Sequence, residues 1–161
     1  MSYEPISLQR IFNLAWQAFI VERRPPGRGP EGCQYRTANG NRCAVGLALD
    51  DEQLDAVDDN SPLGRLVETH PEWFDHSVLA LGNMATSFQY RLHDRLTLDY
   101  LTPNGNVEYI WRCSAKEMER TYREAAYVYG LTIPQPPVTQ SIAGYVGYVP
   151  EHCVALSPNL A

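Results

Sequence analysis

Two cysteines and a histidine–aspartate pair are the residues of this chain whose types could support chemistry. A cysteine becomes a nucleophile when its thiol ionises, which a neighbouring cation favours, and Arg42 adjoins Cys43. His93 could serve Cys43 as general base, with Asp94 as its orienting partner. Adjacent helical residues point about 100° apart, however, so Asp94 is not expected to orient His93. We therefore expect no catalytic residue, and we expect Cys43 to be a small buried side chain.

The same side chains could instead bind a metal or form a disulfide. Structural zinc sites usually contain closely spaced ligand pairs, whereas Cys33, Cys43 and His93 are widely separated. We expect no metal and no other cofactor. A two-residue loop would place the two sulfurs on opposite faces of a hairpin, and a three-residue loop would place them opposite one another. The sequence leaves the metal and disulfide alternatives open.

The turn that positions these cysteines is predicted at Asn39-Gly40. Both residues tolerate positive φ, and this dipeptide between two short runs is a strong hairpin signal. We expect a small hairpin over residues 33–45, with the chain entering the core at Cys43.

Length, charge and hydrophobicity predict one compact domain. The chain has 161 residues, a formal net charge of −6 and 44% hydrophobic residues. An acidic chain lacks the clustered Lys and Arg that duplex binding needs, which argues against a nucleic-acid partner. No apolar run approaches the ~20 residues of a membrane span, and the N-terminus lacks a secretory signal pattern. We expect a cytoplasmic protein with reduced thiols and no membrane partner.

The expected fold class is mainly α (α+β): a compact helical domain over residues 1–131, with one or two small β-hairpins. A Pro-rich extended C-terminal arm, residues 132–161, is expected to pack on this core. Residues 96–112 could form a second hairpin or extend the preceding helix. Helical patterns are predicted to begin at five caps or first-turn signals, which are Ser7, Asp50 or Asp51, Pro62, Asp75 and Ser114. The first pattern runs over residues 7–23, and the one capped by Asp75 is expected to form one long apolar helix that reaches Leu92.

Acidic, basic and aromatic side chains are the candidates for partner or ligand binding. Residues 50–59 contain six carboxylates and no cation, and an acidic patch could dock on a basic protein surface. Aromatic side chains are favoured as interface anchors. The predicted binding residues are Arg36, Arg42, Asp50, Asp51, Asp55, Asp58, Asp59, Tyr109 and Trp111.

Several short motifs together resemble a known family. They are Cys33-x-Tyr35-Arg36, Arg42-Cys43-Ala44-Val45-Gly46, Asp51-Glu52, His93-Asp94 and Gly130-Leu131. This pattern resembles a family of small, largely uncharacterised proteins encoded by phages and prophages, over roughly residues 8–131. Residues 98–112 and the tail after Thr132 depart from the pattern. The resemblance implies a setting in the bacterial host cytoplasm, acting on host machinery or anti-phage defence, and implies no particular activity.

These observations lead to one functional hypothesis and two alternatives. We expect a non-enzymatic binding protein that modulates a host or defence component by stoichiometric binding. The first alternative is a pocket protein that sequesters a nucleotide-like small molecule, with arginines such as Arg36 and Arg42 contacting its charge. The second is a Cys-dependent enzyme that uses Cys43 and His93.

Overall fold

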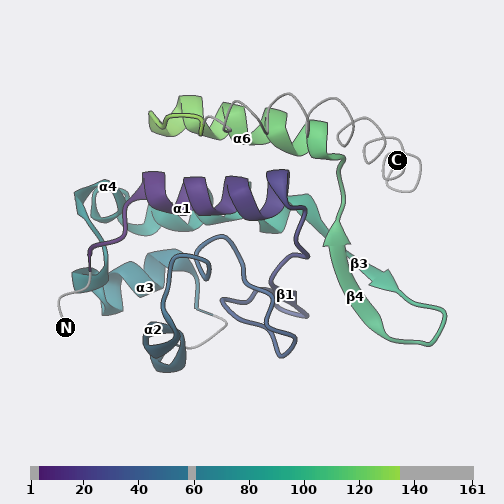
Figure 1. Ribbon diagram of the computed structural model, residues 1–161. Helices are drawn as coiled ribbons and strands as arrows, with labels where there is room; N and C mark the ends of the chain where they lie inside the picture. The colour runs from purple at the N-terminus through teal and green to yellow at the C-terminus, as the bar shows by residue number, and fades with distance from the viewer. Residues whose placement is uncertain (1–3, 58–60, 135–161) are drawn as a thin grey trace.

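The computed structural model describes residues 4–57 and 61–134, which form a mainly helical α+β fold (Figure 1). The α-helices are α1 (Leu8–Ala15), α2 (Asp51–Ala56), α3 (Leu63–Thr69), α4 (His76–Leu79), α5 (Ala85–Leu92) and α6 (Ala115–Tyr129). Two antiparallel strand pairs complete it: β1 (Arg28–Gly29) with β2 (Gly32–Cys33), and β3 (Thr97–Leu101) with β4 (Val107–Trp111). None of the helices described is long and apolar enough to cross a membrane.

The centre of the core is an aromatic cluster between α1, its continuation and α6. The Phe12 and Tyr122 rings lie 5.6 Å apart, and Trp16 lies 6.0 Å from Phe12 and 6.3 Å from Tyr122. The Tyr122 hydroxyl donates to the Leu92 carbonyl at 2.5 Å, which ties α6 to the end of α5. In Figure 1, α6 runs alongside α1, and the β3–β4 hairpin projects from the helical body.

Side-chain caps begin the helices where the sequence predicted them. Ser7 caps α1 and Asp75 caps α4. Asp50 and Ser114 each form a capping box, with Gln53 and Glu117 respectively, which satisfies two orphan N–H groups at each helix start. The cap predictions at these positions are confirmed.

Two predicted helices change form along their length. α1 continues as a π-helix, η1 (Trp16–Val21), so the helical pattern over 7–23 is confirmed but its second half is wider than an α-helix. The helix after Asp75 does not run unbroken to Leu92. It divides into α4 and α5 at η3 (Gly82–Met84), because Gly82 has a left-handed φ of 52°.

One predicted hairpin is confirmed and the other is displaced. Residues 96–112 form the β3–β4 hairpin, which decides between the two alternatives for this stretch. The expected hairpin over 33–45 is wrong, because strand pairing joins residues 28–29 to 32–33 instead. The Asn39-Gly40 turn itself is present, since Gly40 has φ 83° and Thr37 N–H donates to Asn41 O at 2.8 Å. The flanking segments there are too irregular to form strands.

The start of the C-terminal arm contacts α1. Gln9 Nε2 donates to Thr132 O, and Thr132 N–H donates to Gln9 Oε1, both at 2.8 Å. These paired hydrogen bonds place residue 132 against the N-terminal helix. The remainder of the predicted arm, residues 135–161, lies outside the described residues.

Candidate functional site

The structure brings together chemistry-bearing side chains from two distant parts of the chain. Cys33 ends β2, whereas His93 and Asp94 follow α5, and one ligand atom from each lies within 4.8 Å of the other two. Cys43 adjoins Cys33, because Gln89 Nε2 donates to Cys33 Sγ at 2.9 Å and lies 3.9 Å from Cys43 Sγ. We call Cys33, Cys43, Gln89, His93 and Asp94 the thiol–histidine cluster.

The alternatives left open for the cysteines can now be compared with the structure. Cys33, Cys43 and Cys113 are free thiols, so no disulfide joins Cys33 to Cys43 in this structure. Cys43 N–H donates to Gln34 O at 3.2 Å, which brings the two cysteine-bearing segments side by side. Cys33 and His93 are far apart in the sequence, so their proximity in the structure could not be predicted from it.

Asp94 orients His93, and the expectation that it would not is wrong. His93 terminates α5 with φ −142° and ψ −72°, so the chain has left helical geometry at this residue. His93 Nδ1 lies 2.8 Å from Asp94 Oδ1, and Gly27 N–H donates to His93 Nε2 at 3.0 Å. Because Nε2 accepts that hydrogen bond, the network assigns the proton to Nδ1, which donates to Asp94.

These hydrogen bonds leave His93 without a lone pair that could deprotonate a thiol. Burial lowers the pKa of His93, although Asp94 acts in the opposite direction. Burial also raises the pKa of Cys33 well above its ordinary value, with further increases from Cys43 and Asp94 and an opposing effect from Gln89. A neutral thiol beside an occupied histidine is poorly arranged for nucleophilic catalysis.

No family model, curated protein or solved structure matches this chain.

Sequence reasoning missed Gln89 and Gly27 as members of this region. Gln89 is 3% exposed, and its Oε1 accepts a hydrogen bond from Leu63 N–H at 3.0 Å, so its Nε2 is directed at the two sulfurs. Gln89 precedes His93 by four residues, and helical spacing places the two on one face. This four-residue spacing is the sequence signal that could have identified Gln89. No such signal exists for Gly27, because it contributes only its backbone N–H.

Glycines let three irregular segments approach backbone to backbone around the cluster. Gln34 N–H donates to Gly27 O at 2.9 Å. A Cβ on Gly27 would lie 2.2 Å from Arg42 C and from Cys43 N, and a Cβ on Gly46 would lie 1.9 Å from Tyr35 O. We call this arrangement of residues 27, 34–35 and 42–46 the stacked backbone. These close backbone contacts hold residues 27–46 in place, although this part of the chain contains little regular secondary structure.

Cys43 is buried at the centre of this arrangement, as the sequence predicted. It is 0% exposed, and its Sγ accepts a hydrogen bond from Gly46 N–H at 3.4 Å. We expect Cys43→Ser to lower the free energy of unfolding by about 1–3 kcal/mol, because a hydroxyl costs more to bury than a sulfur at a position with no contact to water. Urea unfolding measures the change, and the half-buried Cys113→Ser is the matched control. Equal stability of the Cys43→Ser variant and the wild-type protein would contradict the expectation.

The acidic stretch has cationic partners that its local sequence did not reveal. Arg36 Nη2 lies 2.5 Å from Asp55 Oδ1, and Arg42 Nη2 lies 2.8 Å from Asp51 Oδ1. Asp50 is occupied as the cap of α2. The described part of the predicted docking patch is therefore largely neutralised, while Asp58 and Asp59 lie outside the described residues. The predicted binding residues Arg36 and Arg42 hold α2 against the turn.

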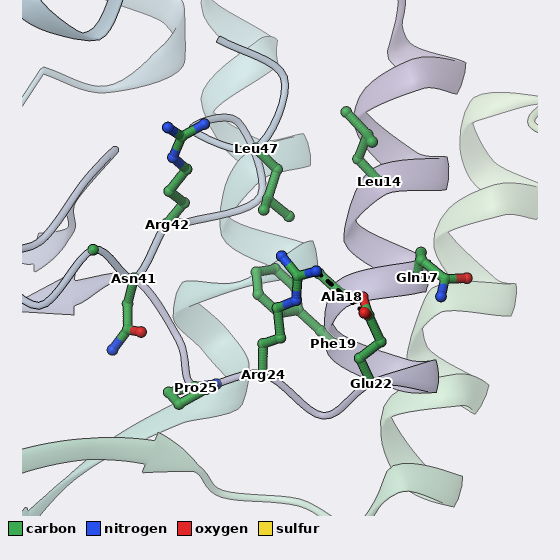
Figure 2. Close-up of a pocket in the computed structure, with 11 residues that line it drawn as sticks. Leu14, Gln17, Ala18, Phe19, Glu22, Arg24, Pro25, Asn41, Arg42 and Leu47 are labelled. Atoms are coloured by element: carbon green, nitrogen blue, oxygen red, sulfur yellow. Dashed lines mark hydrogen bonds and ion pairs between the residues drawn. The ribbon is translucent and has the colours of Figure 1, made fainter. Parts of the chain in front are cut away.

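A cavity of about 360 Å³ lies between η1 and the turn (Figure 2). Arg24 and Arg42 line it together with apolar side chains such as Phe19 and Leu47. Its size falls within the range of small-ligand sites. Figure 2 shows Arg24 reaching toward Glu22, at 3.1 Å, and Arg42 pairs with Asp51. An anionic ligand would have to displace these carboxylates, which weakens the case for a nucleotide-like molecule.

The two aromatic candidates lie on the β3–β4 hairpin, in different environments. Trp111 is buried, and its Nε1 donates to Arg24 O at 2.7 Å, so it belongs to the core. Tyr109 is half-buried, with the Arg28 guanidinium 5.9 Å from its ring centre. Beyond Tyr109, Leu101 and Val107 are paired across the strands and are 69% and 54% exposed. Within this hairpin, the tip therefore carries an exposed apolar pair; elsewhere, Met84 and the α6 residues Tyr127 and Val128 are exposed as well.

Proposed function

We propose that this protein acts by stoichiometric binding to another protein, with the tip of the β3–β4 hairpin as the docking surface. The exposed apolar pair Leu101 and Val107 carries the proposal. The resemblance to phage and prophage proteins suggests a host or anti-phage defence component in the bacterial cytoplasm as the partner. The arrangement of His93 and Cys33 supports binding over turnover.

The hairpin supports docking through its side-chain alternation. Thr97 and Trp111 pair at its base and are buried, whereas Leu101 and Val107 pair at its tip and are exposed. Because side chains alternate along a strand, these residues share one face that continues from the core into solvent. A two-stranded hairpin is marginal alone, so a partner that covers this face would stabilise it.

Charge on the hairpin indicates the chemistry of the partner. Asp99 lies on the same face as Leu101, whereas Glu108, which pairs with Tyr100, lies on the opposite face of the hairpin. The chain as a whole has a net charge of −6. A partner with an apolar patch bordered by basic groups fits such a surface. The ion pair between Arg28 and Asp99 is long, at 3.9 Å, and leaves the Asp99 side chain 67% exposed.

The test is a double substitution at the hairpin tip. Leu101→Ser with Val107→Ser should weaken binding to a partner captured from bacterial lysate by at least about tenfold, as expected for central interface residues. Tyr127→Ser is the matched control, since Tyr127 is 91% exposed on α6. Calorimetry measures the affinity and a stoichiometry near one. Raising the salt concentration should weaken binding, because it screens the acidic groups.

Three outcomes would overturn this proposal. One is equal loss of binding in the hairpin and Tyr127→Ser variants. Another is self-association of the wild-type chain in ultracentrifugation that disappears in the hairpin variant, because the surface would then bind a second copy. The third is modification of many partner molecules by each protein molecule.

A further inference from the structure

We propose that Cys33, His93 and Asp94 form a binding site for one zinc ion. Their ligand atoms, a sulfur, a ring nitrogen and a carboxylate oxygen, lie within 4.8 Å of one another. Zinc takes this combination of ligands, whereas magnesium and calcium prefer oxygen alone. The site is separate from the hairpin tip and goes beyond the proposed binding function.

The distances are close to those of a metal-bound set. Zinc–ligand bonds of roughly 2.0–2.3 Å in a tetrahedron place neighbouring ligand atoms about 3–4 Å apart. The widest pair, within 4.8 Å, must therefore close by up to roughly 1 Å, whereas His93 Nδ1 and Asp94 Oδ1, now 2.8 Å apart, must separate to admit an ion. His93 is fully buried and packs between Phe19 and Trp111, with ring centres 5.7 and 5.4 Å away. Cys33 and Asp94 are the half-buried members, so they supply the movement.

Gln89 is arranged to support a zinc-bound thiolate. Its Oε1 accepts the Leu63 N–H, which leaves its Nε2 donating to Cys33 Sγ at 2.9 Å. An N–H donor aimed at a ligating sulfur stabilises the charged form and orients the ligand. A buried amide held in this way is the kind of outer-sphere partner that metal ligands have in proteins.

Charge balance also favours a divalent ion. One thiolate and one carboxylate together neutralise Zn²⁺, with His93 as a neutral ligand. Without the ion, Asp94 and an ionised Cys33 would repel one another in a poorly solvated place. Asp94 is 25% exposed, so water can complete the coordination on the solvent side. The fourth position therefore needs no further protein ligand.

A zinc ion must compete with the hydrogen bonds that His93 makes in the metal-free protein. Each His93 ring nitrogen already has a hydrogen-bond partner, Asp94 for Nδ1 and Gly27 for Nε2. Coordination through Nδ1, the nitrogen beside Asp94, removes both hydrogen bonds, because the Nδ1 proton must then move to Nε2, which faces the Gly27 N–H. The Cys33 proton passes to solvent. The protein is therefore expected to fold with or without the ion, and zinc is an added ligand of the folded state.

Zinc titration of the full chain, after treatment with a chelator, tests the site. Calorimetry with Zn²⁺ alone should give one ion per chain. Cys33→Ser and Asp94→Asn should each lower the affinity by at least about 10–100-fold, the loss that changes even to outer-sphere partners of a metal cause. Cys113→Ser is the matched control and should bind as the wild-type protein does. Co²⁺ should produce a sulfur-to-metal charge-transfer band that is missing in the Cys33→Ser variant.

The proposal is overturned if the wild-type chain shows no saturable one-to-one Zn²⁺ binding. It is equally overturned if Cys33→Ser, with a circular dichroism spectrum like that of the wild type, binds Zn²⁺ unchanged. Should Cys33→Ser fail to fold, the Co²⁺ band of the wild-type protein decides: its absence at saturating Co²⁺ excludes a thiolate ligand. Partner binding through the hairpin is measured separately, so either proposal can fail alone.

Discussion

Gly46→Ala is expected to destabilise the fold by about 3 kcal/mol or more, at the upper end of the range for overpacking. The added Cβ would lie 1.9 Å from Tyr35 O and 2.8 Å from Tyr35 C. Both are backbone atoms, so no rotamer change can relieve the clash. One of the two segments of the stacked backbone must move, and Cys43 and Tyr35 lose their packing with it. Urea unfolding of the two proteins gives the difference in free energy.

Gly40→Ala separates this steric effect from the conformational effect of losing a glycine. Gly40 has φ 83° but no atom within 4 Å of an added Cβ, so its substitution costs only the left-handed backbone strain, about 1–2 kcal/mol. We expect Gly46→Ala to be clearly the less stable of the two variants. A Gly46→Ala loss no larger than that of Gly40→Ala would show that residues 35 and 46 are not in backbone contact.

His93→Leu is expected to cost about 3 kcal/mol or more in the metal-free protein. Leucine fills much of the same space but leaves the buried Gly27 N–H without an acceptor and removes the partner of the Asp94 carboxylate. An unsatisfied buried donor costs about 1–3 kcal/mol, and hydrogen bonds to charged groups are worth more than neutral ones. Unfolding is measured with a chelator present, so that bound zinc does not contribute.

His76→Leu is the matched control, because His76 is exposed on α4. Exposed substitutions usually change stability by less than about 0.5 kcal/mol. A His93→Leu protein as stable as the His76→Leu protein would mean that the hydrogen bonds of His93 contribute nothing net to the fold.

The helical part of the fold could be read from the sequence because its signals are local. Ser7, Asp75 and Ser114 are caps that act within their own first turns, and buried residues of α6 such as Met118 and Tyr122 follow a helical period. The division of the helix at Gly82 was missed, because a glycine inside an apolar pattern signals a break only weakly. The displaced hairpin was missed because Arg28–Gly29 and Gly32–Cys33 are too short to show alternation.

The site was only partly predictable, for a different reason. Cys33, Cys43 and His93 were identified by residue type, but their proximity depends on how the segment before α2 meets the end of α5. Side-chain pairing of Asp94 with His93 requires a non-helical backbone at the helix end, which sequence spacing does not encode. Similarly, the Arg36 and Arg42 partners of the acidic stretch precede it by 9 to 19 residues, beyond the range of local patterns.

The stacked backbone also bears on the order in which the protein folds. Its neighbourhood is held by hydrogen bonds that span large sequence distances: Gly27 to His93 across 66 residues, Cys33 to Gln89 across 56, and Arg24 to Trp111 across 87. Helices form from local contacts, whereas these bonds require closure of long loops, whose entropy must be lost before the contact is gained. We infer that α5 and the β3–β4 hairpin form first, and that the cysteine-bearing segment closes onto them late in folding.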